Sequence, residues 1–220
     1  MNRRPTVLAA ITLTTVTALC LSACGNDNDD KAGDSNGKIA GAQTDKETSA
    51  SPETSPSAVS GRPKIELPSD VKRVFEGGKT GDTVKDAVLA DSADRMGAID
   101  AAITGTDPKG EALAYYNTGK ALESALSWVA QWKKANATLT GETRYYDREV
   151  TLKGKTSAVV IFCADESKGF SKDKTTGKVA KTPVTKNSYV LYNTRLDKNP
   201  DGVWQTSQVI ATRGAARCQP

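Results

Sequence analysis

The sequence contains no histidine, and this absence limits the chemistry that its side chains could perform. It excludes Ser-His-Asp and Cys-His nucleophilic catalysis, together with the usual histidine-containing zinc sites. Any general base would have to be Asp, Glu, Lys or Tyr. Asp165 and Glu166 follow a strongly apolar run and could lie at the rim of a pocket, but a solvated strand end is the simpler interpretation. We therefore assign no catalytic residue, and we expect no cofactor.

The aromatic residues are the side chains best suited to bind a ligand. Small-molecule pockets are mostly apolar with a few polar groups, and tyrosine and tryptophan supply both properties. The candidate pocket residues are Tyr116, Trp128, Trp132, Tyr145, Tyr189 and Trp204. Trp128 lies at the edge of its helix's apolar stripe, which favours a place at a cavity mouth. The alternative is that these side chains only fill the core between a helix and a sheet.

Two charged patterns could attract ions or polymers. Residues 197–202 match the first half of a calcium-binding loop, D-x-[DN]-x-[DN]-G. The twelfth position is Gln208 rather than the bidentate Glu, and Asn, Pro, Asp and Gly are also the residues of a hairpin turn. We therefore predict no metal site. A lysine-rich segment over residues 168–186 could contact an anionic cell-wall polymer, but a solvated surface explains it as well.

The first 24 residues carry the signature of export. Two arginines precede an uncharged, apolar stretch over residues 7–21, which is short for a membrane-spanning helix of about 20 residues. Leu21-Ser22-Ala23-Cys24 resembles the lipobox of bacterial lipoproteins, in which the cysteine thiol receives diacylglycerol and the chain is cut before it. The resemblance implies a signal peptide over residues 1–23. Acylated Cys24 would then anchor the protein in the lipid bilayer, on the extracytoplasmic face of the cell membrane. An ordinary secretory signal with a chance cysteine is the alternative.

Two further cysteines, Cys163 and Cys218, would remain in the exported chain. An even pair in an oxidising compartment is most simply a disulfide bond. Because Cys218 is third from the end, this bond would hold the C-terminus against the rest of the domain. The alternative is a pair of free, reactive thiols.

Residues 24–62 differ in composition from the rest of the chain. They contain no aromatic residue, and Ile39 and Val59 are their only large aliphatic residues. Such a segment cannot bury enough apolar surface to offset its conformational entropy, so we predict a disordered tether. Residues 63–220 have the length of one domain with its own core. The formal net charge of +4 is small. Together with the predicted export of the chain, it indicates no nucleic-acid partner.

Apolar residues recur at helical spacing in the first part of this domain, and β-branched and aromatic runs follow. The pattern predicts helices over residues 69–76, 82–104, 107–116 and 118–134, and then strands over residues 143–152, 158–163, 189–196 and 203–212. The run 158–163 is continuously apolar, as is typical of a central strand covered on both faces. Helices followed by antiparallel strands indicate an α+β domain.

This order of elements resembles the NTF2-like (cystatin-like cone) architecture, in which about three N-terminal helices pack on a curled antiparallel sheet. Uncharacterised actinobacterial lipoproteins are similar in several stretches, namely residues 67–72, 144–148, 163–167 and 202–206, and in the terminal Cys218. The resemblance implies a concave pocket between the long third helix and the sheet. It transfers no catalytic residue.

These features favour a non-catalytic module that binds an unknown small ligand or interacts with a protein or wall partner. Two other functions stay open. A small ketosteroid-isomerase-like enzyme would need a carboxylic acid of raised pKa facing the pocket near a tyrosine. A structural component of the wall or of a membrane complex would show an exposed apolar patch and a filled cone.

Overall fold

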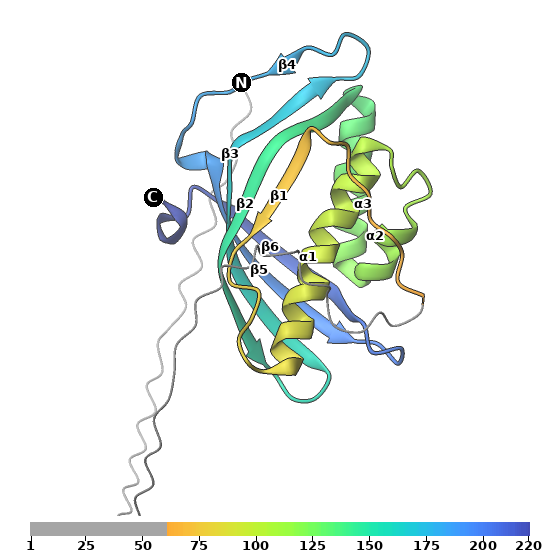
Figure 1. Ribbon diagram of the computed structural model, residues 1–220, viewed down its shortest axis with the longest axis vertical. Coiled ribbons are helices and arrows are strands. Elements are labelled where there is room, and N and C mark those ends of the chain that lie inside the picture. The colour runs from red at the N-terminus through yellow and green to blue at the C-terminus, as the bar shows by residue number, and fades with distance from the viewer. Residues whose placement is uncertain (1–60) are drawn as a thin grey trace, which may run out of the picture. The chain divides into compact units, whose positions relative to one another are not determined.

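The computed structural model describes residues 61–220 (Figure 1). The expected signal peptide, Cys24 and the tether up to residue 60 lie outside the described residues. The elements are β1 (Val71–Phe75), α1 (Thr83–Thr104), α2 (Glu111–Tyr116), α3 (Gly119–Lys134), β2 (Ala137–Leu152), β3 (Ser157–Asp173), β4 (Val179–Ala180), β5 (Tyr189–Lys198) and β6 (Trp204–Arg213). Two 3₁₀ turns, Lys186–Ser188 and Ala216–Cys218, precede β5 and end the chain. The predicted α+β class is confirmed. None of the helices in this part of the chain is long and apolar enough to cross a membrane.

The strands form one curved sheet in the order β1-β2-β3-β5-β6, with β4 added to β3. β1 runs parallel to β2, and every other pair is antiparallel. The sheet is therefore mixed, whereas the sequence predicted a purely antiparallel one. Register shifts in β2 next to Glu142 and Tyr146 bend the long strands. Figure 1 shows the resulting concave face turned toward α1 and α3.

The helix predicted over residues 69–76 is wrong, because Val71–Phe75 is strand β1. Burial alternates along its five residues, and Val71 begins a parallel register opposite Gly141. Phe75 stacks on Tyr145 of β2, with ring centroids 4.6 Å apart. A segment this short fits the helical and the strand period equally, so the free edge of β2 decided its conformation.

Helix α1 is fixed at both ends and along its length. Asp82 caps its first turn by accepting hydrogen bonds from two backbone amides, and Gly105 ends it in the left-handed conformation. Halfway along, the buried Asp91 pairs with Arg62 and also accepts a 2.8 Å hydrogen bond from the backbone amide of Trp204. Arg62 is the last residue that the sequence assigned to the tether, and this contact places it against α1.

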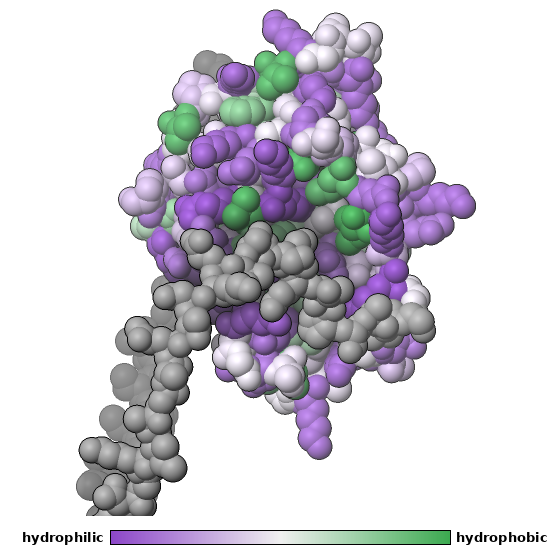
Figure 2. Space-filling view, viewed as in Figure 1, coloured by the Kyte–Doolittle hydropathy of each residue, from purple (hydrophilic) through white to green (hydrophobic). Residues whose placement is uncertain are grey.

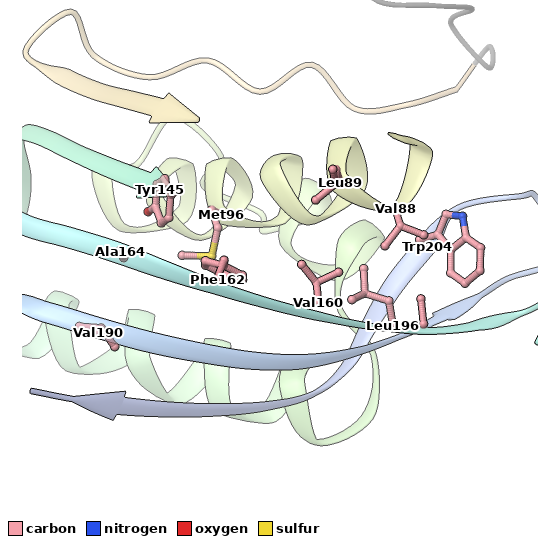
Figure 3. Close-up of a cluster of buried hydrophobic side chains, with 11 residues drawn as sticks. Val88, Leu89, Met96, Tyr145, Val160, Phe162, Ala164, Val190, Leu196 and Trp204 are labelled. Atoms are coloured by element: carbon pink, nitrogen blue, oxygen red, sulfur yellow. The ribbon is translucent and has the colours of Figure 1, made fainter. Parts of the chain in front are cut away.

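The apolar core fills one end of the concave face. Val88 and Leu89 of α1 pack there against Val160, Leu196 and Trp204 of the sheet. Figure 3 shows these side chains at one end of α1, with Met96 and Tyr145 toward the other end. On the face drawn in Figure 2, hydrophilic residues predominate and hydrophobic residues lie in small separate groups. This packed cluster does not fill the other end of the concave face, where the cavity of the candidate site lies.

The convex face of the sheet is covered in part by the end of the chain. The predicted disulfide is confirmed, since Cys163 of β3 is bonded to Cys218, and both residues are fully buried. The hydroxyl of Tyr146 donates a hydrogen bond to the carbonyl of Cys218. Because Phe162, next to Cys163 in the strand, faces the concave core, the disulfide lies on the opposite face.

Candidate functional site

A cavity of about 530 Å³ lies between α1, α3 and the sheet. Volumes of roughly 300–1,000 Å³ are typical of small-molecule sites. Helix α1 contributes one face of two turns to the wall, including Met96, Ile99 and Ile103. Helix α3 contributes Trp128 and Trp132, which lie one turn apart. Their rings are packed edge to face, with the ring centroids 5.9 Å apart. Most of this wall is therefore apolar.

The sheet supplies the opposite wall. β2 and β3 contribute Leu139 and Phe170, and β6 contributes alternate residues beginning at Val209. Trp128 is 44% exposed, so its indole lies where the cavity meets solvent. A ligand could thus enter beside α3 without any rearrangement of the core.

The most unusual lining residue is Arg95 of α1. It is 5% exposed, yet no carboxylate among residues 61–220 lies within salt-bridge distance of its guanidinium. Its Nε donates a 2.7 Å hydrogen bond to Oδ1 of Asn117, and Nη1 contacts the sulfur of Met96 at 3.3 Å. Burial lowers the pKa of Arg95 to about 10. At neutral pH the cavity therefore contains a buried positive charge that is not paired with any carboxylate of residues 61–220.

Asn117 explains the orientation of this arginine. The asparagine is 1% exposed, and its side-chain amide donates a 2.9 Å hydrogen bond to the carbonyl of Leu113. The amide oxygen is thereby left to accept from Arg95. One guanidinium edge is fixed by this contact, and the terminal Nη2 has no hydrogen-bond partner in the described chain.

Two tyrosine hydroxyls line the same cavity. Tyr145 is held by stacking on Phe75, and Tyr192 by stacking on Phe162 at 5.0 Å. Neither hydroxyl is hydrogen-bonded to any residue of the described chain. Burial raises the pKa of Tyr192 to about 12 and also raises that of Tyr145. Both phenols are therefore neutral near pH 7 and can donate hydrogen bonds.

The two carboxylates of the cavity wall are already paired. Asp100 forms an ion pair with Arg73 of β1, and Glu166 of β3 forms one with Arg213 at 2.7 Å. Asp100 and Glu166 therefore offer no free carboxylate for proton abstraction. They also leave Arg95 as the charge of the cavity that nothing balances.

The structure separates the candidate pocket residues into two groups. Trp128, Trp132 and Tyr145 line the cavity. Tyr116 is buried beneath Arg62, and Trp204 lies in the filled end of the core. Tyr189 precedes the inward-facing Val190 in β5, so strand alternation turns it away from the helices.

Sequence reasoning missed Arg95. The signal was available, because Arg95 directly precedes Met96 and lies four and eight residues before Ile99 and Ile103. A positive charge among residues predicted to face the core needs either a partner or a function. The missing information was that no acidic side chain in the described part of the chain forms a salt bridge with it.

The calcium-like loop over residues 197–202 is occupied by its own contacts. Asp197 pairs with Arg195 and accepts a 2.6 Å hydrogen bond from Ser207. Asn199 accepts a 2.8 Å hydrogen bond from the backbone amide of Val203, which closes the turn between β5 and β6. Within residues 61–220 no group of three acidic or cysteine side chains is placed to hold a metal ion. The geometry is that of a hairpin turn.

No family model matches this sequence, and no curated protein matches it. Solved structures show distant likeness in fold. The intermembrane-space region of the chloroplast protein ARC6 is 10% identical with a TM-score of 0.42, over 61% of this chain and 99% of that one. A ketosteroid isomerase-like protein from Erwinia carotovora atroseptica is 18% identical with a TM-score of 0.37, and the match covers 61% of this chain and 98% of that one. A protein from Catenulispora acidiphila is 10% identical with a TM-score of 0.41, and the match covers 59% of this chain and 93% of that one. At these values none of the three indicates what this chain binds.

Proposed function

We propose that this protein is a lipid-anchored lipoprotein whose NTF2-like domain binds a small organic ligand without transforming it. The observation that carries the proposal is the cavity of about 530 Å³, open beside Trp128 and lined by side chains of both helices and the sheet. The succession of three helices followed by long strands, with the helices on the concave face, supports the NTF2-like assignment.

The anchor rests on the sequence at the start of the chain. Arginines, an apolar stretch and Leu21-Ser22-Ala23-Cys24 occur in the order and spacing of a lipoprotein signal. Acylation of Cys24 would hold the domain at the extracytoplasmic face of the cell membrane, within reach of membrane-derived and wall-derived molecules. Mass spectrometry of the protein purified from membranes would test this, since the mature chain should begin at a diacylglycerol-modified Cys24. A chain that begins elsewhere, or a Cys24 without lipid, would refute the anchor.

The state of the cavity carboxylates favours binding over catalysis. A ketosteroid-isomerase-like mechanism needs a carboxylate free to accept a proton near a tyrosine donor. Tyr145 is present in the cavity, but Asp100 and Glu166 are each paired with an arginine. Turnover of an added ketone or enol by the purified protein, lost on substitution of Asp100, would overturn this assignment.

A purely structural role is less well supported. Leu126 and Trp128 on α3 are exposed, and so is Ile210 on β6, which alternates with the cavity-lining Val209 and Ala211 and therefore faces away from the cavity. On the face that Figure 2 draws, the hydrophobic residues lie in small separate groups rather than in one broad patch. The cavity is also open rather than filled, which a scaffold does not require.

The direct test is to titrate residues 25–220 with a neutral apolar fluorophore, N-phenyl-1-naphthylamine. Trp128 and Trp132 line the cavity and Trp204 does not, so binding should quench the first two indoles. A Trp128→Phe, Trp132→Phe double variant should bind the dye without that quenching. Absence of saturable binding to the wild-type chain would refute the ligand-binding proposal.

A further inference from the structure

We propose that the cavity selects amphipathic monoanions, molecules with an apolar body and a single carboxylate-like head that Arg95 binds. This inference rests on the proposed ligand-binding function and specifies the chemical class of its ligand. The contacts of Arg95, the neighbouring hydroxyls and the charges at the cavity wall each support it.

The first observation is an unbalanced charge in a buried place. Arg95 is 5% exposed and has one hydrogen bond to a neutral amide and one contact to a thioether. A buried charge without a partner is costly, and proteins normally pair it or keep it in water. Asn117 holds the guanidinium in place rather than neutralising it. An anion entering the cavity would supply the counter-charge that the fold itself does not.

The second observation is the set of free donors around this charge. Nη2 of Arg95 and the hydroxyls of Tyr145 and Tyr192 all belong to cavity-lining residues, and none has a hydrogen-bond partner in the described chain. A carboxylate offers two oxygens with lone pairs for several donors. Guanidinium and carboxylate form the strongest hydrogen bonds of this kind, because both partners are charged.

The third observation limits the charge of the ligand. Asp100 and Glu166 also line the cavity, each held by its own arginine. Each carboxylate is balanced by its arginine, so the net charge left in the cavity is the single positive charge of Arg95, which one negative charge on the ligand neutralises. A cation would face Arg95 directly and is excluded by the same electrostatics.

The rest of the wall defines the other part of the ligand. Ile99 and Ile103 of α1, Trp132 of α3 and Leu139 of β2 form an apolar surface beside the polar group. Such a surface favours an aliphatic or aromatic body by roughly 25 cal/mol per Å² buried. Together, one cationic end and an apolar wall match an amphipathic acid.

The experiment compares two dyes that differ in charge. 1-Anilinonaphthalene-8-sulfonate carries one negative charge on the same aromatic body as the neutral N-phenyl-1-naphthylamine. Both are titrated into residues 25–220 of the wild type and of Arg95→Met. The charged dye should lose roughly 10- to 100-fold in affinity in the variant, as expected for lost charge-assisted hydrogen bonds. The neutral dye should change by less than about threefold. Dodecanoate should displace the charged dye from the wild type, and methyl dodecanoate should do so much less.

Two further variants keep the test decisive. Tyr192→Phe removes a hydroxyl with no partner in the described chain, so it should fold normally and weaken only the charged dye. Arg195→Met makes the same charge change at a half-exposed arginine outside the cavity, so it should leave both affinities unchanged. If Arg95→Met does not fold, Tyr192→Phe and Arg195→Met decide the question by the same difference between dyes.

The outcomes separate the two proposals. If the neutral dye binds but neither Arg95→Met nor Tyr192→Phe weakens the charged dye selectively, the monoanion inference is wrong and the ligand-binding function stands. If Arg195→Met weakens the charged dye as much as Arg95→Met does, the preference comes from net charge and the inference is also wrong. If neither dye saturates the wild type, both proposals fail together.

Discussion

Breaking the disulfide between Cys163 and Cys218 should lower the free energy of unfolding by about 4 kcal/mol. The bond joins residues 55 apart in the sequence, and closing a loop of that length removes entropy from the unfolded chain worth roughly 4 kcal/mol at 25 °C. The folded state gives no reason for a smaller effect, since both half-cystines are fully buried and the chain end is held by the hydroxyl of Tyr146.

The assay is urea unfolding of residues 25–220, followed by tryptophan fluorescence. Three samples are compared, namely the oxidised wild type, the wild type in reductant, and a Cys163→Ala, Cys218→Ala double variant. With a urea dependence of roughly 2 kcal/mol per molar, the midpoint should fall by about 2 M in the second and third samples. Reductant should not change the midpoint of the double variant, which controls for its effects elsewhere.

The loop-entropy reasoning would be refuted if the oxidised and reduced wild type unfolded at the same urea concentration. A loss confined to the alanine variant would instead indicate that packing of the buried sulfurs, rather than the cross-link, supplies the stability. The three samples therefore distinguish the two physical origins.

Three other predictions concern individual residues. Asp91→Ala should lower the free energy of unfolding, measured in urea, by about 2–4 kcal/mol, because the backbone amide of Trp204 and the guanidinium of Arg62 lose their acceptor. Lys64→Ala breaks an exposed ion pair and should lower it by less than about 1 kcal/mol. Gly141→Ala should lower the free energy of unfolding by at least about 2 kcal/mol, because Gly141 has a φ of 94° and an added Cβ would lie 2.1 Å from the carbonyl oxygen of Lys168. Gly154 has a similar φ of 102° but open space around it. Gly154→Ala should therefore lower the free energy of unfolding by less in the same assay. Affinity for the charged dye should be constant below about pH 10 and fall above it, because the pKa of Arg95 in the free protein is lowered to about 10 and only the protonated form attracts an anion. Fluorescence titrations from about pH 8 to about pH 11 check this. A neutral-dye affinity that fell in parallel would indicate unfolding instead.

Much of the fold could be predicted from the sequence because the signals were long. Helix α1 has a capping Asp82, an apolar stripe over about five turns and a terminating Gly105, and the structure places the helix between those two residues. Strand β3 contains the continuous apolar run 158–163 and lies in the middle of the sheet. The disulfide could be predicted because an even pair of cysteines remained once the first two were assigned to export.

The elements that failed were short or depended on a partner. Five residues at Val71–Phe75 carry too few apolar positions to distinguish a helix from a strand, and pairing with β2 determined the result. The parallel direction of that pairing could not be predicted either, since it follows from the chain crossing over the sheet through α1 to α3 before β2 begins.

The candidate site was predicted in part, and strand alternation explains the division. Tyr145 and Tyr146 are adjacent and chemically identical, yet one lines the cavity and the other binds the carbonyl of Cys218 on the convex face. Val150 and Leu152 pack against the same core as Tyr145. Unbroken alternation back from them would turn Tyr146 rather than Tyr145 toward the cavity, and the bulge of β2 next to Asp147, whose φ is 48°, reverses this. A bulge shifts every following side chain to the other face, and the sequence contains no clear sign of its position.

The buried arginines indicate why one end of the concave face is open while the other is filled. At the filled end, α1 presents Val88 and Leu89 and buries the charge of Asp91 against Arg62. At the open end, the same helix presents Arg95, whose charge no acidic side chain of residues 61–220 balances. An apolar side chain at that position would avoid the cost of burying an unpaired charge, as replacement of buried charges often does. Arg95 is therefore hard to explain as a packing residue, and a ligand that neutralises it gives the position a physical reason.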